Sequence, residues 1–171
     1  MLQGAETKQK NSLQGQTSSL HNLTTDAVFT VILVVLGMIK LPSLIPGAEF
    51  QLSAPYAVCL ASVVGFKRYL CIGICSSLIQ FMLGTHTVWN VLIAMVFRIV
   101  AGLILTFLPN NRLVVAISGP AGTAAARTVI AAVLNLPLWP LLAAAAPGMV
   151  FTAIASLILL PVFRRIMGQS A

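Results

Sequence analysis

The sequence predicts an all-α polytopic membrane protein with six transmembrane helices and both termini in the cytoplasm. Of its 171 residues, 58% are hydrophobic and only 8% are charged, and the mean hydropathy is +0.99. A typical soluble domain has about a quarter of its residues charged, so this much apolar surface requires lipid as its solvent. Residues 31–39 and 91–108 are apolar on nearly every face, which excludes the period-two alternation of a membrane β-barrel.

The chain divides into a predicted flexible polar tail, residues 1–25, and a six-helix transmembrane domain, residues 26–171. The tail is rich in Gln, Ser, Thr and Asn, and such a composition does not bury a core. The apolar run 27–39 follows, and no small-x-small cleavage site with a soluble chain after it is present. We therefore expect an uncleaved first helix rather than a signal peptide.

Prolines, glycines and charged residues delimit the later helices. We expect helices at about 53–66, 69–83, 88–108 and 113–134, and a sixth that ends before Arg164. Lys67 and Arg68 break the apolar run between the second and third helices. These two are short for a hydrocarbon core of about 30 Å, so they are either tilted spans or a re-entrant pair.

The basic residues orient the bundle, because cytoplasmic loops of membrane proteins carry an excess of Lys and Arg. In a six-span chain, seven of them lie on one side, against Lys40 on the other: Lys8, Lys10, Lys67, Arg68, Arg112, Arg164 and Arg165. We therefore expect these seven basic residues to lie on the cytoplasmic side of the cell membrane. A five-span chain would mix the charges.

Arg98 and Arg127 remain inside predicted spans, at about 15 Å and about 21 Å from the cytoplasmic ends of their helices. The acids of the chain are Glu6, Asp26 and Glu49, and none lies in the middle of a span. A buried arginine needs a partner. The candidates are backbone carbonyls, an interface reached by snorkelling, a partner subunit, or an anionic ligand held by the guanidinium group.

The predicted outer side concentrates polar and aromatic side chains that can close over a small molecule. They are Glu49, Gln51, Tyr56, His86, Trp89, Asn90, Asn135 and Trp139. The two tryptophans are equally expected as anchors at the membrane interface. In the fifth helix, Gly122 and Ala126 have the four-residue spacing of small residues that lets helices approach closely, so we expect tight packing there, within the monomer or between subunits.

Several functions have no signal in the sequence. There is no phosphate-binding loop ending in Gly-Lys-Ser/Thr, no His-Glu-x-x-His, no Gly-x-Ser-x-Gly and no carboxylate pair, so we expect no enzymatic activity. The basic residues are scattered between apolar runs, which argues against nucleic-acid binding. Cys59, Cys71 and Cys75 lie in apolar segments and predict neither a disulfide framework nor a metal site. We expect no cofactor.

The pattern resembles the substrate-binding S components of energy-coupling factor (ECF) transporters, over about residues 24–166. The resemblance rests on the six-helix size and orientation, the outer loop 41–51, the turn Val-Gly-Phe-Lys-Arg-Tyr-Leu-Cys-Ile-Gly at 64–73, the run 93–104, and the small residues of the fifth helix. The Ala-x-x-x-Ala motif typical of the first helix in that family is missing. Four residues after Ala27 the chain has Val31, and four residues after Thr30 it has Val34.

The resemblance implies import of a small vitamin or micronutrient, bound in the outer half of the bundle. The implied contacts are Arg127, Glu49, Gln51, Trp89 and Asn90. The implied partners are a transmembrane coupling subunit and two ATPase subunits. Two alternatives stay open at this point: a stand-alone permease or channel for small solutes, and a structural scaffold. The arginines and tryptophans indicate a solute that is small, flat and at least partly anionic.

Overall fold

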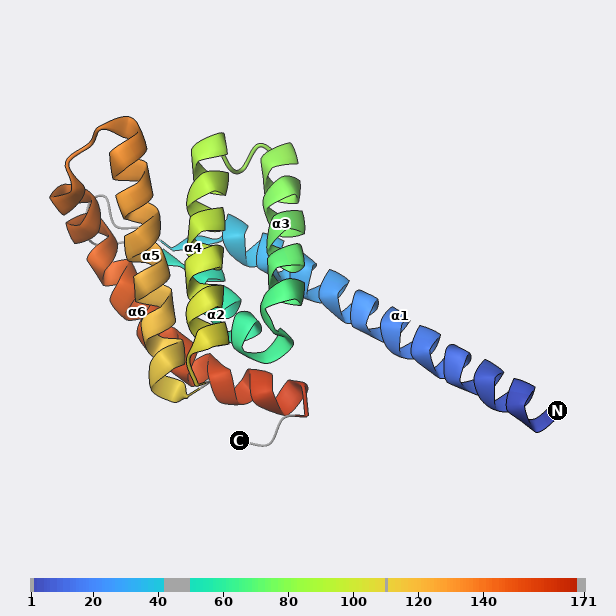
Figure 1. The fold of residues 1–171 in the computed structure, drawn as a ribbon. Coiled ribbons are helices and arrows are strands. Elements are labelled where there is room, and N and C mark those ends of the chain that lie inside the picture. The colour runs from blue at the N-terminus through green and yellow to red at the C-terminus, as the bar shows by residue number, and fades with distance from the viewer. Residues whose placement is uncertain (1, 42–49, 110, 169–171) are drawn as a thin grey trace.

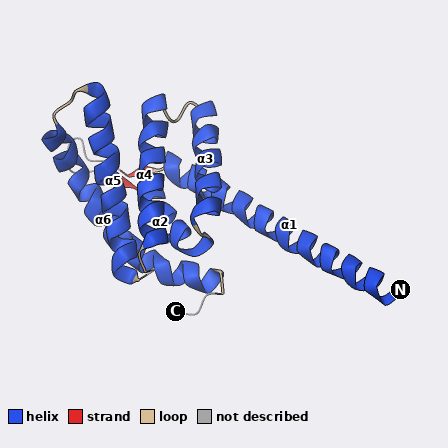
Figure 2. Cartoon of the chain, viewed as in Figure 1, coloured by secondary structure: helices blue, strands red, loops and turns tan. Residues whose placement is uncertain are grey.

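The computed structural model describes residues 2–41, 50–109 and 111–168, with side chains from Leu20 onward except at 40, 41 and 50. Over these residues the chain forms six α-helices and one pair of two-residue strands (Figure 2). The elements are α1 (Leu2–Met38), β1 (Lys40–Leu41), β2 (Phe50–Gln51), α2 (Ser53–Val64), α3 (Phe66–Met82), α4 (Val88–Phe107), α5 (Arg112–Leu134) and α6 (Leu138–Ile166). The predicted helical fold is confirmed, and the antiparallel β1–β2 pair was not predicted.

The short helix α2 lies at the centre of the bundle. It contacts each of the other five helices, and eight of its twelve residues are buried. Helices α3, α4 and α5 run side by side in front of it, while α6 crosses below (Figure 1). At a rise of about 1.5 Å per residue, α2 is only about 18 Å long. It therefore serves as a core element more than as a wall facing lipid.

Four stretches of the described residues are long and apolar enough to cross a membrane: Leu20–Met38, Val88–Phe107, Arg112–Leu134 and Leu138–Ile166. Large apolar side chains such as Leu113, Ile117 and Ile158 are more than half exposed on the outside of the bundle. Contiguous apolar surface of this kind needs lipid around it. The chain is thus a helical membrane protein, with α2 and α3 outside the group of four candidate spans.

The boundary between α2 and α3 lies at Gly65, two residues before the break expected at Lys67 and Arg68. Gly65 has a φ of 84°, a left-handed conformation that glycine adopts without steric cost. Both basic residues belong to the first turns of α3. The expectation of a break at the charges was wrong because a positive charge ends an apolar run without ending a helix.

Helix α1 is continuous from Leu2, whereas composition predicts a flexible tail up to residue 25. No proline occurs before Pro42, so nothing in the backbone chemistry stops the helix earlier. Its N-terminal part extends away from the bundle (Figure 1). Near the bundle, Arg68 of α3 holds α1 through an ion pair with Asp26, with N–O distances of 2.5 and 3.1 Å.

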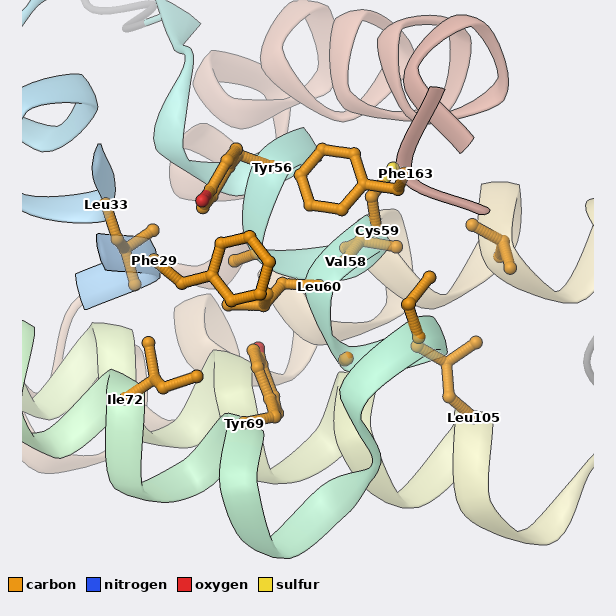
Figure 3. Packing of buried hydrophobic residues seen from close by; sticks show 14 of the residues in the cluster. Phe29, Leu33, Tyr56, Val58, Cys59, Leu60, Tyr69, Ile72, Leu105 and Phe163 are labelled. Atoms are coloured by element: carbon orange, nitrogen blue, oxygen red, sulfur yellow. The ribbon is translucent and has the colours of Figure 1, made fainter. Parts of the chain in front are cut away.

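The hydrophobic core draws side chains from all six helices, with aromatic rings of α1, α2, α3 and α6 among them (Figure 3). The ring of Phe163 stacks on Phe29 at a centroid distance of 6.4 Å and meets the edge of Tyr56 at 5.1 Å. Such pairs add about 0.5–1.5 kcal/mol each beyond the area that they bury. They hold the C-terminal part of α6 against α1 and α2.

Candidate functional site

A cavity of about 290 Å³ lies among the six helices, each of which contributes to its lining. Its volume is close to the lower end of the range for small-molecule sites, about 300 Å³. The lining comes from α1, from β2 with the start of α2, and from α3 to α6, together with the α3–α4 turn. It comprises Leu33, Gln51, Ser53, Ala54, Ala57, Gln80, His86, Asn90, Ile93, Ala94, Phe97, Arg98, Thr123, Ala126, Arg127, Ala145, Gly148 and Thr152. Nine of these eighteen residues are polar or charged, so the lining combines apolar surface with several groups that can orient a small organic solute through hydrogen bonds.

Arg127 reaches the cavity from α5 and is half-buried. Among the residues that the structure describes, none forms an ion pair or hydrogen bond with its guanidinium group. The described ion pair of the bundle joins Arg68 and Asp26 and lies elsewhere. Arg127 therefore presents a positive charge and five N–H donors to the cavity.

Arg98 lines the same cavity from α4 but is 6% exposed. Its Nη1 and Nη2 atoms donate to the hydroxyls of Ser77 and Ser76, at 2.5 and 3.1 Å. These serines belong to α3, so the arginine ties α3 to α4. The serine pair satisfies part of the hydrogen-bonding capacity of Arg98 while leaving its charge uncompensated among the described side chains. Hydroxyl partners were not among the alternatives considered from the sequence.

The structure brings some of the other sequence candidates to the cavity and not others. Gln51 and Asn90 line it. Trp89 is 44% exposed and does not line it, because neighbouring residues on a helix point about 100° apart. The alternative expectation, that Trp89 is an anchor at the membrane interface, stays a prediction. Glu49 lies outside the described residues.

The small residues of α5 face its neighbours within the same chain. A Cβ at Gly122 would lie 2.9 Å from a ring carbon of Phe97 and 3.0 Å from the carbonyl oxygen of the same residue. Ala126, one turn later, is 1% exposed and lines the cavity. Close approach of α4 and α5 therefore sets the separation at which Arg98 and Arg127 face a shared space.

Sequence reasoning missed Gln80, Ser53, Thr123 and Thr152, all of which line the cavity. Each is a single polar residue in a largely apolar segment, and for Gln80 that isolation was a usable signal. The threonines carried none, since their hydroxyls bond to carbonyls of their own helices, as Thr152 does to Gly148 at 2.8 Å. Among the described residues, no three His, Cys, Asp or Glu side chains form a group able to hold a metal ion.

No family model matches the chain. Over 137 residues it is 46% identical to Protein BioX from Lysinibacillus sphaericus, and the match covers 80% of this chain and 82% of the relative. The chain belongs to the BioX family. A matched stretch of this length includes residues 35–137 wherever it begins. Helices α2 to α5, with both arginines of the cavity, thus lie within the part shared with the BioX relative.

Proposed function

We propose that the chain is a membrane-embedded binding subunit for uptake of a small vitamin that carries a carboxylate, and that the cavity holds this solute. The observation that carries the proposal is Arg127, a half-buried guanidinium group with no described partner on the wall of a cavity in a membrane bundle. Planar guanidinium binds a carboxylate through two parallel hydrogen bonds. A carboxylate ligand would supply the negative charge that the described lining lacks.

The name of the BioX relative supports biotin as the first solute to test. Biotin joins a carboxylate to a short apolar chain and a compact cyclic urea. The cavity offers a matching sequence of groups, with Arg127 on α5, apolar side chains such as Ile93 and Phe97 on α4, and polar side chains on α3 and α4. A solute of this shape uses both the charge and the apolar wall.

For the transport step, we propose the arrangement implied by ECF S components. The chain would then work with a transmembrane coupling subunit and two ATPase subunits, which supply the energy of import. Support comes from the sequence resemblance and from the sidedness of the bundle. The start of α3, the start of α5 and the end of α6, all bearing basic residues, lie together at one end (Figure 1). That end would face the cytoplasm.

Binding of radiolabelled biotin to the purified, detergent-solubilised protein tests the proposal. We expect Arg127→Lys and Arg127→Gln to remain monodisperse and to lose at least about tenfold in affinity, or about 1.4 kcal/mol. Lysine keeps the charge but loses the planar fork. Arg112→Gln is the matched control, because Arg112 belongs to the same helix, is exposed and lies outside the cavity.

Native mass spectrometry of the wild-type protein provides an independent measurement, because a solute that co-purifies would be identified by its mass. Normal biotin binding by both Arg127 variants would make Arg127 a structural arginine and remove the anionic-ligand argument. Absence of biotin binding by the wild type, together with a different co-purifying carboxylate, would retain the binding function and replace biotin as its solute.

A further inference from the structure

Gln80 is a buried amide whose side-chain oxygen has no described partner. Its side chain is 2% exposed and lines the cavity, and Oε1 makes no hydrogen bond within the part of the chain that the structure describes. An unsatisfied buried acceptor is costly, and native structures contain few of them. Because Gln80 lines the cavity, rotation of its side-chain amide toward a bound solute would give this oxygen the partner that the described chain does not provide.

The backbone of Gln80, not its side chain, organises the end of α3. Its carbonyl oxygen accepts hydrogen bonds from the amides of Thr85 and His86, at 3.1 and 3.3 Å, and from the Thr85 hydroxyl at 2.9 Å. The α3–α4 turn is therefore held without any contribution from the Gln80 amide. A structural role in this turn does not account for a polar side chain at this depth.

Because Gly37 of α1 has no side chain, it leaves space for the side-chain amide of Gln80. A Cβ at Gly37 would lie 2.6 Å from Oε1 and 2.7 Å from Nε2 of Gln80. Glycine is less favourable than alanine inside a helix, so a glycine here has a cost that close packing against the amide explains. The contact packs the end of the Gln80 side chain closely between α1 and α3.

We infer that Gln80 is a specificity-determining residue that accepts a hydrogen bond from a neutral N–H group of the solute, of the amide or urea class. The inference rests on the proposed function, in which Arg127 holds the carboxylate. Gln80 and Arg127 belong to α3 and α5, on opposite sides of α4 (Figure 1). A solute between them carries an anion at one end and an N–H donor at the other.

Two probes test the contribution of the N–H groups separately from that of the carboxylate. Biotin carries both the carboxylate and two urea N–H groups, and an analogue methylated on both urea nitrogens retains the carboxylate but has no N–H. We expect the wild type to bind biotin at least about tenfold more tightly than the methylated analogue, because the analogue leaves the buried acceptor unpaired.

Gln80→Met keeps a linear side chain of similar length and removes the acceptor. It should bind biotin about tenfold more weakly than the wild type and bind both probes alike. Gly37→Ala should also weaken biotin binding and reduce the preference for biotin, because it displaces the Gln80 amide without replacing any residue that lines the cavity. Ser118→Ala is the control. It removes a buried polar group that lies outside the cavity lining and should keep the preference for biotin.

The outcomes distinguish this inference from the proposed function. Equal binding of the two probes by the wild type would overturn the inference and leave the carboxylate site intact, and this result needs no variant to fold. An unchanged preference in monodisperse Gln80→Met would overturn it as well. If the wild type binds neither probe, the biotin proposal and the inference both fall. Loss of the preference in Gln80→Met and Gly37→Ala, with retention in Ser118→Ala, supports it.

Discussion

The side chain of Arg98 lies directly over Gly73, so that a Cβ at position 73 would come within 2.5 Å of Arg98 Cδ and 2.8 Å of Nε. Helix α3 thus provides a flat surface for the stem of the arginine and, one turn later, the two serine hydroxyls that receive its guanidinium group. The glycine and the serines together fix the position of a cation that faces the cavity.

Gly73→Ala should therefore destabilise the bundle by about 1–3 kcal/mol, the usual range for overpacking of a filled site. The arginine must move or the helices must separate. Thermal unfolding in detergent measures the loss. In an Arg98→Ala background, the same Gly73→Ala change should cost clearly less, because the clashing side chain is gone. Equal costs in both backgrounds would show that the two residues do not interact.

Ser77→Ala should cost about 1–3 kcal/mol of stability, because it leaves a buried donor of Arg98 without a partner. Ser118→Ala is the matched control. Ser118 is buried too, but its hydroxyl donates to the carbonyl of Val115 in its own helix, at 2.8 Å. Its loss should cost distinctly less. Similar unfolding temperatures for the two variants would mean that the Arg98–Ser77 bond contributes little.

The sequence predicted the helices well because each ends at a strong chemical signal. Helices α2, α4 and α5 begin and end within two residues of the expected positions. The positions of Arg98 and Arg127 on neighbouring antiparallel helices followed from helix geometry alone, and both do line one cavity. Composition and the positions of proline and glycine are local features of the chain, so a single sequence is enough to identify them.

What the sequence did not predict depends on contacts between distant segments. The Ser76 and Ser77 hydroxyls meet Arg98 across 21 or more positions of sequence, and no periodicity indicates that pairing. Trp89 and Asn90 were predicted to lie in one site. They point in different directions from α4, so only Asn90 of the two lines the cavity. The central place of α2 follows from tertiary packing, which its short apolar sequence does not reveal.

Gly122→Ala should lower the unfolding temperature more than Gly37→Ala does. The added methyl group at 122 meets the carbonyl oxygen of Phe97 at 3.0 Å, and a helix backbone yields only if α4 and α5 move apart. At Gly37 the nearest atoms belong to the end of the Gln80 side chain, which can rotate away. We expect a loss of about 1–3 kcal/mol for Gly122→Ala. The reverse order of the two unfolding temperatures would contradict the view that α4–α5 packing is the tighter contact.

Reporter fusions test the six-span orientation, because α2 and α3 are shorter than the four candidate spans. Fusions after residues 67 and 112 should read cytoplasmic, and those after 86 and 137 external, because the bias of basic residues places the first pair inside. The bundle agrees with this grouping, since the α3–α4 and α5–α6 turns lie together at the end opposite the starts of α3 and α5 (Figure 1). An external reading at 67 with a cytoplasmic reading at 112 would make α2 and α3 a re-entrant pair around Gly65. The cavity would then open to the side from which that pair enters, and the approach of a solute to Arg127 would have to be assigned to that side.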